Sequence, residues 1–200
     1  MRALDAIATR RSIRRFAPRE VSPTIVRELI AAACAAPAPH HSQPWRFVEV
    51  GPESRPRLIE AMAAAWRVDA AADGVSDSRI EGEVKRSRKQ MADAPLLLLA
   101  CLELDSARSW PDDGRRAAER DMYMQSLGAA LQNLLLAAHA SGLGGYLKGA
   151  PLFCQAAVAE ALALPGGWQP AFLVLLGYPA RGAKAPARLE PRLDDFLVSR

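Results

Sequence analysis

The arginine-rich segment near the start of the chain holds the residues best suited to bind an anion. Four arginines and two hydroxyl side chains fall within residues 9–15, which read Thr-Arg-Arg-Ser-Ile-Arg-Arg. Guanidinium groups this close repel one another unless an anion lies among them, and their planar fork of donors matches the oxygens of a phosphate. The segment therefore predicts a clamp for a phosphorylated ligand. A solvated basic turn is the alternative that this stretch alone leaves open.

Further motifs follow in a fixed order. Residues 36–47 read Ala-Pro-Ala-Pro-His-His-Ser-Gln-Pro-Trp-Arg-Phe, residues 128–138 form part of a long helical pattern, and a Gly-Leu-Gly turn follows at 142–144. Together with the arginine-rich segment, these motifs resemble those of the nitroreductase family of FMN-dependent enzymes. The resemblance covers nearly the whole chain.

The resemblance implies a fold, a cofactor and a reaction. The expected fold is α+β, nitroreductase-like, with a central, mostly antiparallel sheet flanked by helices. Residues 1–200 are expected to form one FMN-binding domain in an intertwined homodimer. The implied activity is that of an FMN-dependent oxidoreductase, in which the flavin passes hydride from a reduced donor to an acceptor in a ping-pong cycle. Because the flavin carries the chemistry, no catalytic side chain is expected.

The same resemblance implies the cofactor-binding residues. Arg10, Arg11, Ser12 and Arg14 are expected at the phosphate and ribityl chain, with Lys184 and Arg188, or Arg192 in place of Arg188, closing on the phosphate. Pro37, Ala38, Pro39 and His41 match a loop that the partner subunit lays against the flavin. Ser87 and Gln90 match positions beside its pyrimidine edge. Leu147, Lys148, Gly149 and Ala150 match the segment that faces the ring.

For several residues in and near these stretches the expected role is more specific than contact with the flavin. Gly149 or Ala150 is expected to donate a main-chain N–H to flavin N5, because Pro151 cannot donate. Lys148 either stabilises negative charge on the reduced ring or points to solvent. Gln43 and Trp45 are expected to brace the partner loop, Gln43 by hydrogen bonds and Trp45 by burial. Arg15 and the basic residues Lys85, Arg86, Arg88 and Lys89 are expected to be solvated.

A narrower resemblance concerns the acceptor. The 36–41 segment, Trp66-Arg67-x-Asp69, Asp73-Gly74, Asp93-Ala94-Pro95 and Pro111-Asp112 are similar to the flavin-binding C-terminal domain of the ligase that builds the deazaflavin coenzyme F-420. This implies reduction of a dehydro precursor of that coenzyme, with a reduced nicotinamide or a reduced deazaflavin as donor. A general NAD(P)H-dependent reductase of nitroaromatics or quinones is one alternative. A flavin-binding module without turnover is another.

The elements that must position these residues follow from hydrophobic periodicity. Helices are predicted over 3–8, 23–36, 57–70 and 119–140, with Ser22 as an N-cap and Pro23 at the first helical position of the second. Strands are predicted over 46–50, 96–104 and 170–178. The continuous apolar run of the 96–104 strand indicates burial on both faces. The apolar second half of the 119–140 helix indicates burial in the core or at a subunit interface. The tail after Pro179 is expected to extend over a surface or a partner.

Composition narrows the class of protein. The 200 residues carry a net charge of +4, and half of them are hydrophobic, as in a soluble globular protein. Basic runs without interleaved aromatics argue against nucleic acid, and no apolar run of membrane-spanning length is present. With no secretory signal pattern at its start, the chain is expected in the cytoplasm. Three cysteines without pair spacing predict buried, reduced thiols, and adjacent His40 and His41 argue against a metal site.

Overall fold

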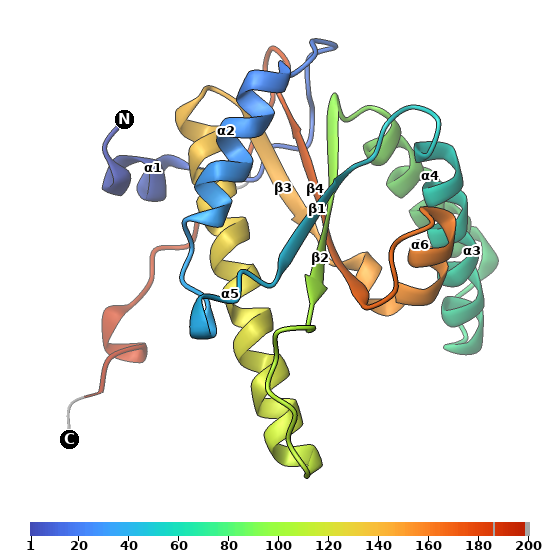
Figure 1. Ribbon diagram of the computed structural model, residues 1–200. Coiled ribbons are helices and arrows are strands. Elements are labelled where there is room, and N and C mark those ends of the chain that lie inside the picture. The colour runs from blue at the N-terminus through green and yellow to red at the C-terminus, as the bar shows by residue number, and fades with distance from the viewer. Residues whose placement is uncertain (186, 199–200) are drawn as a thin grey trace.

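The fold is a four-stranded antiparallel sheet with helices on both faces (Figure 1). The computed structural model describes residues 1–185 and 187–198. The strands β1 (Trp45–Glu49), β2 (Leu96–Glu103), β3 (Gly144–Lys148) and β4 (Trp168–Gly177) lie in the order β1-β2-β4-β3. One face is covered by α2 (Pro23–Cys34) and α5 (Asp113–Ala140), and the other by α3 (Arg55–Ala72), α4 (Asp77–Ala92) and α6 (Gln155–Ala161). The predicted α+β fold with a flanked antiparallel sheet is confirmed.

The leucine run of β2 lies at the centre of the sheet and explains why both faces are covered. Successive side chains of a strand point to opposite faces. Leu96 and Leu98 accordingly pack in one cluster with α2 and α5, while Leu97 and Leu99 pack in a second cluster with Leu58 of α3. All residues of β2 except Glu103 are buried. The predicted burial of this strand on both faces is confirmed.

Most element boundaries differ from the predicted ones by a few residues. α2 ends at Cys34, before the expected 36, and α3 extends beyond the expected 57–70 at both ends. β1, β2 and β4 differ from their predicted ranges by one or two residues at an end. The largest error concerns α5, which begins at Asp113 and not at 119, because the Asp112 carboxylate accepts a hydrogen bond from Arg115 N (2.8 Å) and caps the helix there.

Three elements were not delimited from the sequence: α4, β3 and α6. β3 has two glycines and only five residues, so its pattern is too short to separate from a turn. It is an element because its whole length pairs with β4, from Gly144 opposite Gly177 to Lys148 opposite Leu173. Short helices complete the chain: α1 (Ala3–Thr9), η1 (Pro39–His41), η2 (Ala150–Phe153) and η3 (Leu193–Asp195).

The arginine-rich segment lies along the free edge of β3. Ser12 forms a parallel bridge with Gly145, and Ile13 N donates to Gly145 O at 3.3 Å. A Cβ at Gly145 would lie 2.4 Å from Leu176 Cδ2 and 3.0 Å from Leu175 O, and one at Gly144 would lie 2.6 Å from Ile13 Cβ. The two glycines therefore allow β3 to approach both β4 and the segment of residues 10–16 closely.

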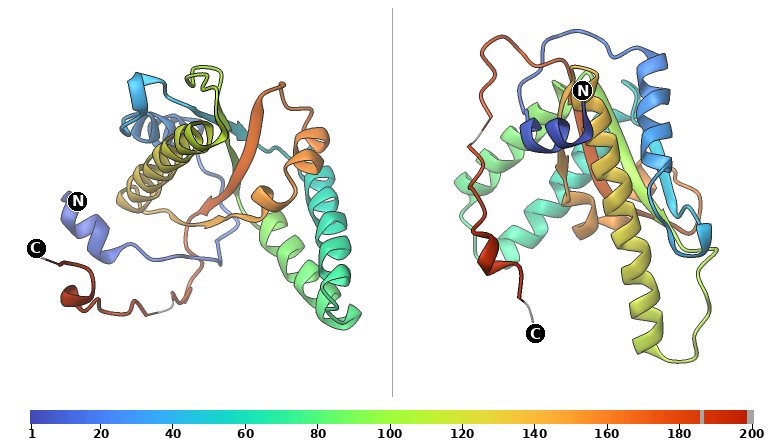
Figure 2. Two further views of the ribbon diagram at one scale, coloured as in Figure 1. Left: turned by 90° about the horizontal axis from the view of Figure 1, so that it is seen from below. Right: turned by 90° about the vertical axis from the view of Figure 1, so that its left-hand side faces the viewer.

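The C-terminal tail runs back along this same segment. Ala180 N donates to Arg15 O at 3.0 Å, and the Arg188 guanidinium donates to Ile7 O (3.0 Å) and Arg10 O (3.2 Å). Figure 2 shows α1 and the tail on the same side of the molecule. The tail therefore contacts its own chain at Arg15, Ile7 and Arg10, and its extension over a partner stays a prediction.

Replacing Gly145 with alanine should destabilise the protein, because the new Cβ would meet main-chain and buried side-chain atoms. Overpacking of this kind costs about 1–3 kcal/mol of unfolding free energy. Gly82→Ala on exposed α4, where nothing lies within 4 Å, should instead stabilise by about 0.5–1 kcal/mol. Urea unfolding measures both. Equal effects of the two substitutions would contradict the close approach at β3.

Candidate active site

The arginine-rich segment presents positive charge that no carboxylate in the described part of the chain neutralises. Arg10, Arg11 and Arg14 take part in none of the ion pairs formed among residues 1–185 and 187–198. Burial lowers the pKa of Arg10, and the nearby positive charges of Arg188 and Arg11 lower it further. Arg10 Nε is buried and lacks a hydrogen-bond partner within these residues. The arrangement is that of an anion site built from the N-terminal segment and the C-terminal tail.

The individual arginines of this segment differ in what they contact. Arg11 Nη1 donates to Ala8 O (2.7 Å) and to Arg10 O (2.9 Å), so part of its hydrogen-bonding capacity is used on the end of α1. Arg14 is exposed and stands over the ring of Tyr146, with its Cζ 5.2 Å from the ring centroid. Of the three predicted basic residues of the tail, Arg188 is the one that lies beside Arg10. Lys184 is exposed, and Arg192 pairs with Asp195 at 3.8 Å.

A cavity of about 500 Å³ lies between α3, α4 and the segment that follows β3; we call it the α3–α4 cavity. Ser87, Gln90, Lys148 and Ala150, four of the predicted site residues, line it. Most of the remaining wall is apolar and includes Ile59, Met62, Ala63, Ala65, Trp66, Val84, Met91 and Phe153. A cavity of this size with a mainly apolar wall and a few polar groups is typical of a small-molecule site.

Lys148 points into the α3–α4 cavity. Its Nζ donates to Ser87 Oγ at 2.6 Å and to Gln90 Oε1 at 3.4 Å, so the ammonium bridges β3 and α4. Burial, together with the nearby positive charge of Arg86, lowers the pKa of Lys148 to about 8. No salt bridge joins Lys148 to a carboxylate of the described chain. Of the two alternatives for this residue, the solvent-pointing one is therefore wrong.

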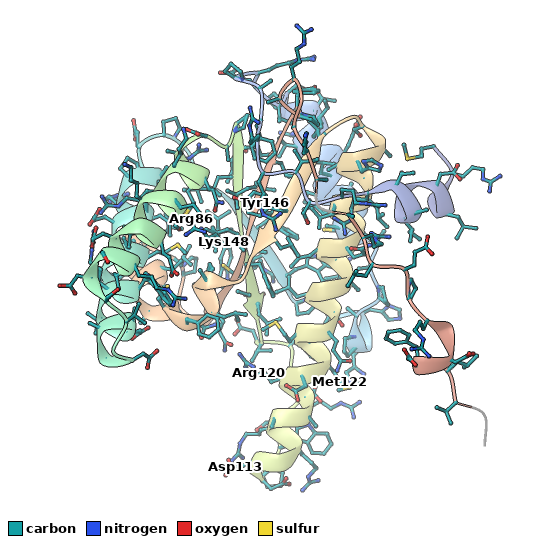
Figure 3. All side chains as sticks on the ribbon, turned by 180° about the vertical axis from the view of Figure 1, so that it is seen from behind. Arg86, Asp113, Arg120, Met122, Tyr146 and Lys148 are labelled. Carbon is teal, nitrogen blue, oxygen red and sulfur yellow. The ribbon has the colours of Figure 1, made fainter. Side chains whose placement is uncertain are left out.

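A second cavity of about 440 Å³ adjoins the first. Arg14, Arg15, Arg86 and Lys89 line it together with Phe16, Gln90, Asp93 and Ala180, and the two cavities share Arg86 and Gln90. Figure 3 shows Arg86, Lys148 and Tyr146 gathered between α4 and the strands. The prediction that the basic side chains of residues 85–89 are solvated is confirmed for Lys85, which is exposed. It is incomplete for Arg86 and Arg88, which line the α3–α4 cavity, and Arg88 also pairs with Glu60 at 2.5 Å.

The predicted partner loop lies away from both cavities. Pro37, Ala38, Pro39 and His41 lie between α2 and β1, across the sheet from α3 and α4 (Figure 1). His40, His41 and Gln43 have positive φ angles of 53°, 54° and 47°, which non-glycine residues seldom adopt. Such strain persists only where the surroundings or a function require it. None of the four predicted loop residues lines either cavity of its own chain.

The two residues expected to brace this loop behave differently. Trp45 is 4 % exposed and its indole N–H donates to Cys34 Sγ at 3.3 Å, which confirms its structural role. Gln43 has an exposed side chain, and it is its main-chain carbonyl that accepts a bond from Arg46 (3.0 Å). Of the three free cysteines, Cys101 is buried, whereas Cys34 and Cys154 are only partly so, which corrects the prediction of full burial.

Several residues of the cavities were not predicted from the sequence. They include Trp66, Met62 and Phe153. Tyr146, whose ring lies under Arg14 beside the cavities, was not predicted either. Tyr146 had a usable signal, because it lies two residues before Lys148 and strand periodicity places both on one face of the sheet. Leu147, by the same rule, lies on the opposite face and is partly exposed. Gly149 has a φ of −83°, so its conformation does not require glycine.

Comparisons with known proteins agree on the family. The sequence model of the Nitroreductase family matches residues 7–178. A Methanothermobacter thermautotrophicus protein named as a candidate NADH dehydrogenase/NAD(P)H nitroreductase is 28% identical over 182 residues, which are 90% of this chain and 78% of that protein. The candidate NAD(P)H nitroreductase YfhC of Bacillus subtilis is 25% identical over 92% of this chain and 88% of its own.

Solved structures show the same fold. A nitroreductase-like protein from Bacillus cereus superposes with a TM-score of 0.76 at 21% identity, over all of this chain and 96% of that one. A nitroreductase from Desulfovibrio desulfuricans, crystallised in complex with FMN, superposes with a TM-score of 0.73 at 26% identity, over all of this chain and 98% of that one. The protein belongs to the nitroreductase family. Within the described residues, no helix is both long and apolar enough to cross a membrane.

The titration of Lys148 gives a prediction for stability. Its pKa is about 8 in the folded protein against an ordinary value of 10.5. Between these two pH values, the unfolded chain binds a proton that the folded chain has released, so the free energy of unfolding contributed by this group rises with pH. Lys148→Met removes the titration. The free energy of unfolding of the variant minus that of the unmodified protein should therefore be larger at pH 7 than at pH 10.

Urea unfolding of both proteins at the two pH values measures this difference. Lys85→Met, at an exposed position of α4, is the control, and its difference from the unmodified protein should not change across this range. A difference for Lys148→Met that stays constant between pH 7 and pH 10 would show that the ammonium is not held in a desolvated position.

Proposed function

We propose that the protein is an FMN-dependent oxidoreductase that moves hydride from a reduced nicotinamide nucleotide to a small acceptor. The observation that carries the proposal is the arginine cluster on the edge of β3, which lacks a counter-charge among the described residues and lies next to a cavity of small-molecule size. The family and the named relatives support it, as does the relative crystallised with FMN.

The residues present fit FMN. A phosphate would neutralise Arg10, Arg14 and Arg188, and it would give Arg10 Nε the acceptor it lacks. The apolar wall of the α3–α4 cavity suits an aromatic ring system, and Ser87, Gln90 and Lys148 supply polar contacts at one side of it. An empty clamp leaves like charges close together, whereas each charge-assisted hydrogen bond to a phosphate contributes about 1.5–3 kcal/mol.

The roles of the residues follow from this fit. Arg10, Ser12, Arg14 and Arg188 would hold the phosphate, with Arg11 and Lys184 as weaker candidates because of their other contacts and exposure. Lys148, with Ser87 and Gln90, would hold the polar edge of the ring, and the main chain at Gly149 or Ala150 would face its N5 atom. Bound FMN would supply the capacity to accept and then release hydride. The apolar wall would keep water from that exchange.

We propose further that the active protein is a homodimer. The α5 helix exposes Gln125, Gly128 and Gln132 along one side, with partly buried Ala129 and Leu136 nearby. The small residues Gly128 and Ala129 within this exposed face would let a second copy pack closely against the helix. The strained loop at 37–41 would then reach the partner's flavin, which would account for its distance from the cavities of its own chain.

The F-420 precursor is a narrower candidate for the acceptor. It rests on the resemblance of short motifs, and one observation favours it: Trp66 and Asp69 of those motifs line the α3–α4 cavity. The relatives described above carry nitroreductase names, so a nitroaromatic or quinone acceptor takes first place. Rates of reoxidation of the reduced protein by the dehydro precursor and by menadione separate the two. A flavin-loaded protein that neither compound reoxidises would instead be a flavin-binding module.

Removing two clamp arginines should abolish tight FMN binding. Arg10→Ala combined with Arg14→Ala deletes two charge-assisted contacts, and should therefore raise the FMN dissociation constant at least about 100-fold. Quenching of flavin fluorescence measures the constant. The control is Arg57→Ala with Lys85→Ala, two exposed cations outside both cavities, which removes the same charge. Similar affinities of the two double variants for FMN would exclude the clamp.

The dimer gives a separate prediction. Gly128→Arg puts a long, charged side chain on the exposed side of α5, where nothing in the chain lies within 4 Å of a Cβ. The variant should fold, elute as a 21.6 kDa monomer and lose FMN, while the unmodified protein has twice that mass. Gly82→Arg on α4 is the control and should remain a dimer. Light scattering after size exclusion gives the masses, and a dimeric Gly128→Arg variant would contradict this interface.

A further inference from the structure

The first half of α5 extends beyond the sheet, and the segment of residues 104–112 runs back along it (Figure 1). We call this segment the β2–α5 loop. Glu119 lies where the loop meets the helix. It is 5 % exposed and is the one charged residue that is buried among those the structure describes. It takes part in no ion pair with another described residue. A buried carboxylate without a cation is costly unless neutral donors satisfy it.

The donors that satisfy Glu119 both come from the β2–α5 loop. Arg108 N donates to Glu119 Oε1 at 3.1 Å, and the indole N–H of Trp110 donates to Oε2 at 3.2 Å. These two bonds lower the pKa of Glu119 below its ordinary value. One turn further along α5, the buried Tyr123 donates its hydroxyl to Ser106 O at 3.0 Å. The helix therefore fixes the loop at three points along its length.

Trp110 is the residue of this loop that is held most closely. Besides the bond to Glu119, its main-chain carbonyl accepts from Arg116 Nη1 at 2.6 Å. The guanidinium of Arg115 lies over its ring, with Cζ 4.8 Å from the ring centroid. The indole is nevertheless partly exposed, and it packs in none of the hydrophobic clusters formed by the described residues. A rigid aromatic ring that the core does not use is suited to contact a flat ligand.

The β2–α5 loop lies beside the strained loop at 37–41. Both views of Figure 2 show η1 and the β2–α5 loop on the same side of α5. Ala38 and Ala107 pack against one cluster of buried residues, which includes Tyr123. The charge of His40 also lies near enough to Glu119 to lower the pKa of that carboxyl further. Because the strained loop is proposed to reach the partner's flavin, the β2–α5 loop would arrive at that flavin with it.

We propose that Trp110 forms a wall of the acceptor site of the partner subunit, where its ring stacks on planar aromatic acceptors, and that Glu119 positions it there. Arg115 covers one face of the indole, which leaves the opposite face for the ligand. A flat apolar surface favours quinones and nitroaromatics over aliphatic acceptors. This inference rests on the proposed function, because it requires both bound flavin and the dimer.

Equilibrium binding of menadione, a planar quinone, to the oxidised, FMN-loaded protein tests the role of Trp110 without turnover. The change in the visible absorbance of the flavin reports the binding. Trp110→Ala should raise the dissociation constant of menadione at least about fivefold, as the loss of an aromatic stacking contact requires. Trp168→Ala is the control and should leave the constant unchanged. Its indole N–H also donates to a carboxylate, Glu103 at 3.2 Å, but it packs on the opposite face of the sheet.

Glu119→Leu tests the positioning role. Leucine accepts neither bond from the loop, so this variant keeps the ring of Trp110 but releases it, and the dissociation constant of menadione should rise about as much as in Trp110→Ala. Combining the two substitutions should weaken binding no further than Trp110→Ala alone, because Glu119 acts through that ring. Glu119→Gln, which keeps the shape of the side chain, gives the same comparison if the leucine variant does not fold. Additive effects would overturn the positioning role.

Flavin content and mass in solution separate this inference from the proposed function. Trp110→Ala should keep both its FMN and its dimeric mass. Equal affinities of this variant and the unmodified protein for menadione, or no measurable affinity of either, would overturn the inference and leave the proposed function standing. A monomeric or flavin-free Trp110→Ala variant would do the same, because the indole would then be a contact of the dimer or the cofactor. An unmodified protein that is monomeric or binds no FMN would overturn both.

Discussion

The repulsion among guanidinium groups at the edge of β3 is the constraint on which the rest of this account depends. Burial lowers the pKa of Arg10, and the nearby charges of Arg188 and Arg11 lower it further. No carboxylate of the described chain forms an ion pair with any of the three. The fold nonetheless holds them there: Gly144 and Gly145 let residues 10–16 pair with β3, and the tail bonds to main-chain carbonyls of Ile7 and Arg10. A fixed cluster of like charges is favourable once a multivalent anion occupies it.

Helix α4 connects this anion site to the cavity beside it. Its residues Ile80 and Val84 are buried against α3, and Met91 is buried against the sheet, so the helix is held in place from both sides. The neighbouring positions then direct Ser87 and Gln90 to Lys148 and place Arg86 and Lys89 at the second cavity. One helix therefore supplies neutral hydrogen-bonding groups to the ring-sized cavity and cations to its neighbour. Burial of the Lys148 ammonium beside them lowers its pKa to about 8, which makes the protonation of the cavity sensitive to pH above neutrality.

Sequence patterns predicted the parts of this molecule that depend on local chemistry. The leucine run of β2 predicted a strand buried on both faces, and the proline at 23 after Ser22 predicted the start of α2. The arginine density predicted an anion site before any fold was known. Patterns missed β3 because its identity as a strand comes from pairing with β4, whose partner residues lie 33 positions further along the chain for Gly144 and 25 positions further for Lys148. They also missed both cavities. The first forms where α3 and α4 meet the segment after β3, and the second forms where residues 14–16 meet α4.

The comparison of FMN with riboflavin tests the central claim most directly, because the two ligands share the ring system and differ by the phosphate. Titration of the flavin-free protein with each compound, followed by fluorescence quenching, gives the two dissociation constants. If the arginine cluster exists to hold a phosphate, FMN should bind at least about 100-fold more tightly than riboflavin, as two or more charge-assisted hydrogen bonds require. Equal affinities for the two flavins would contradict the account.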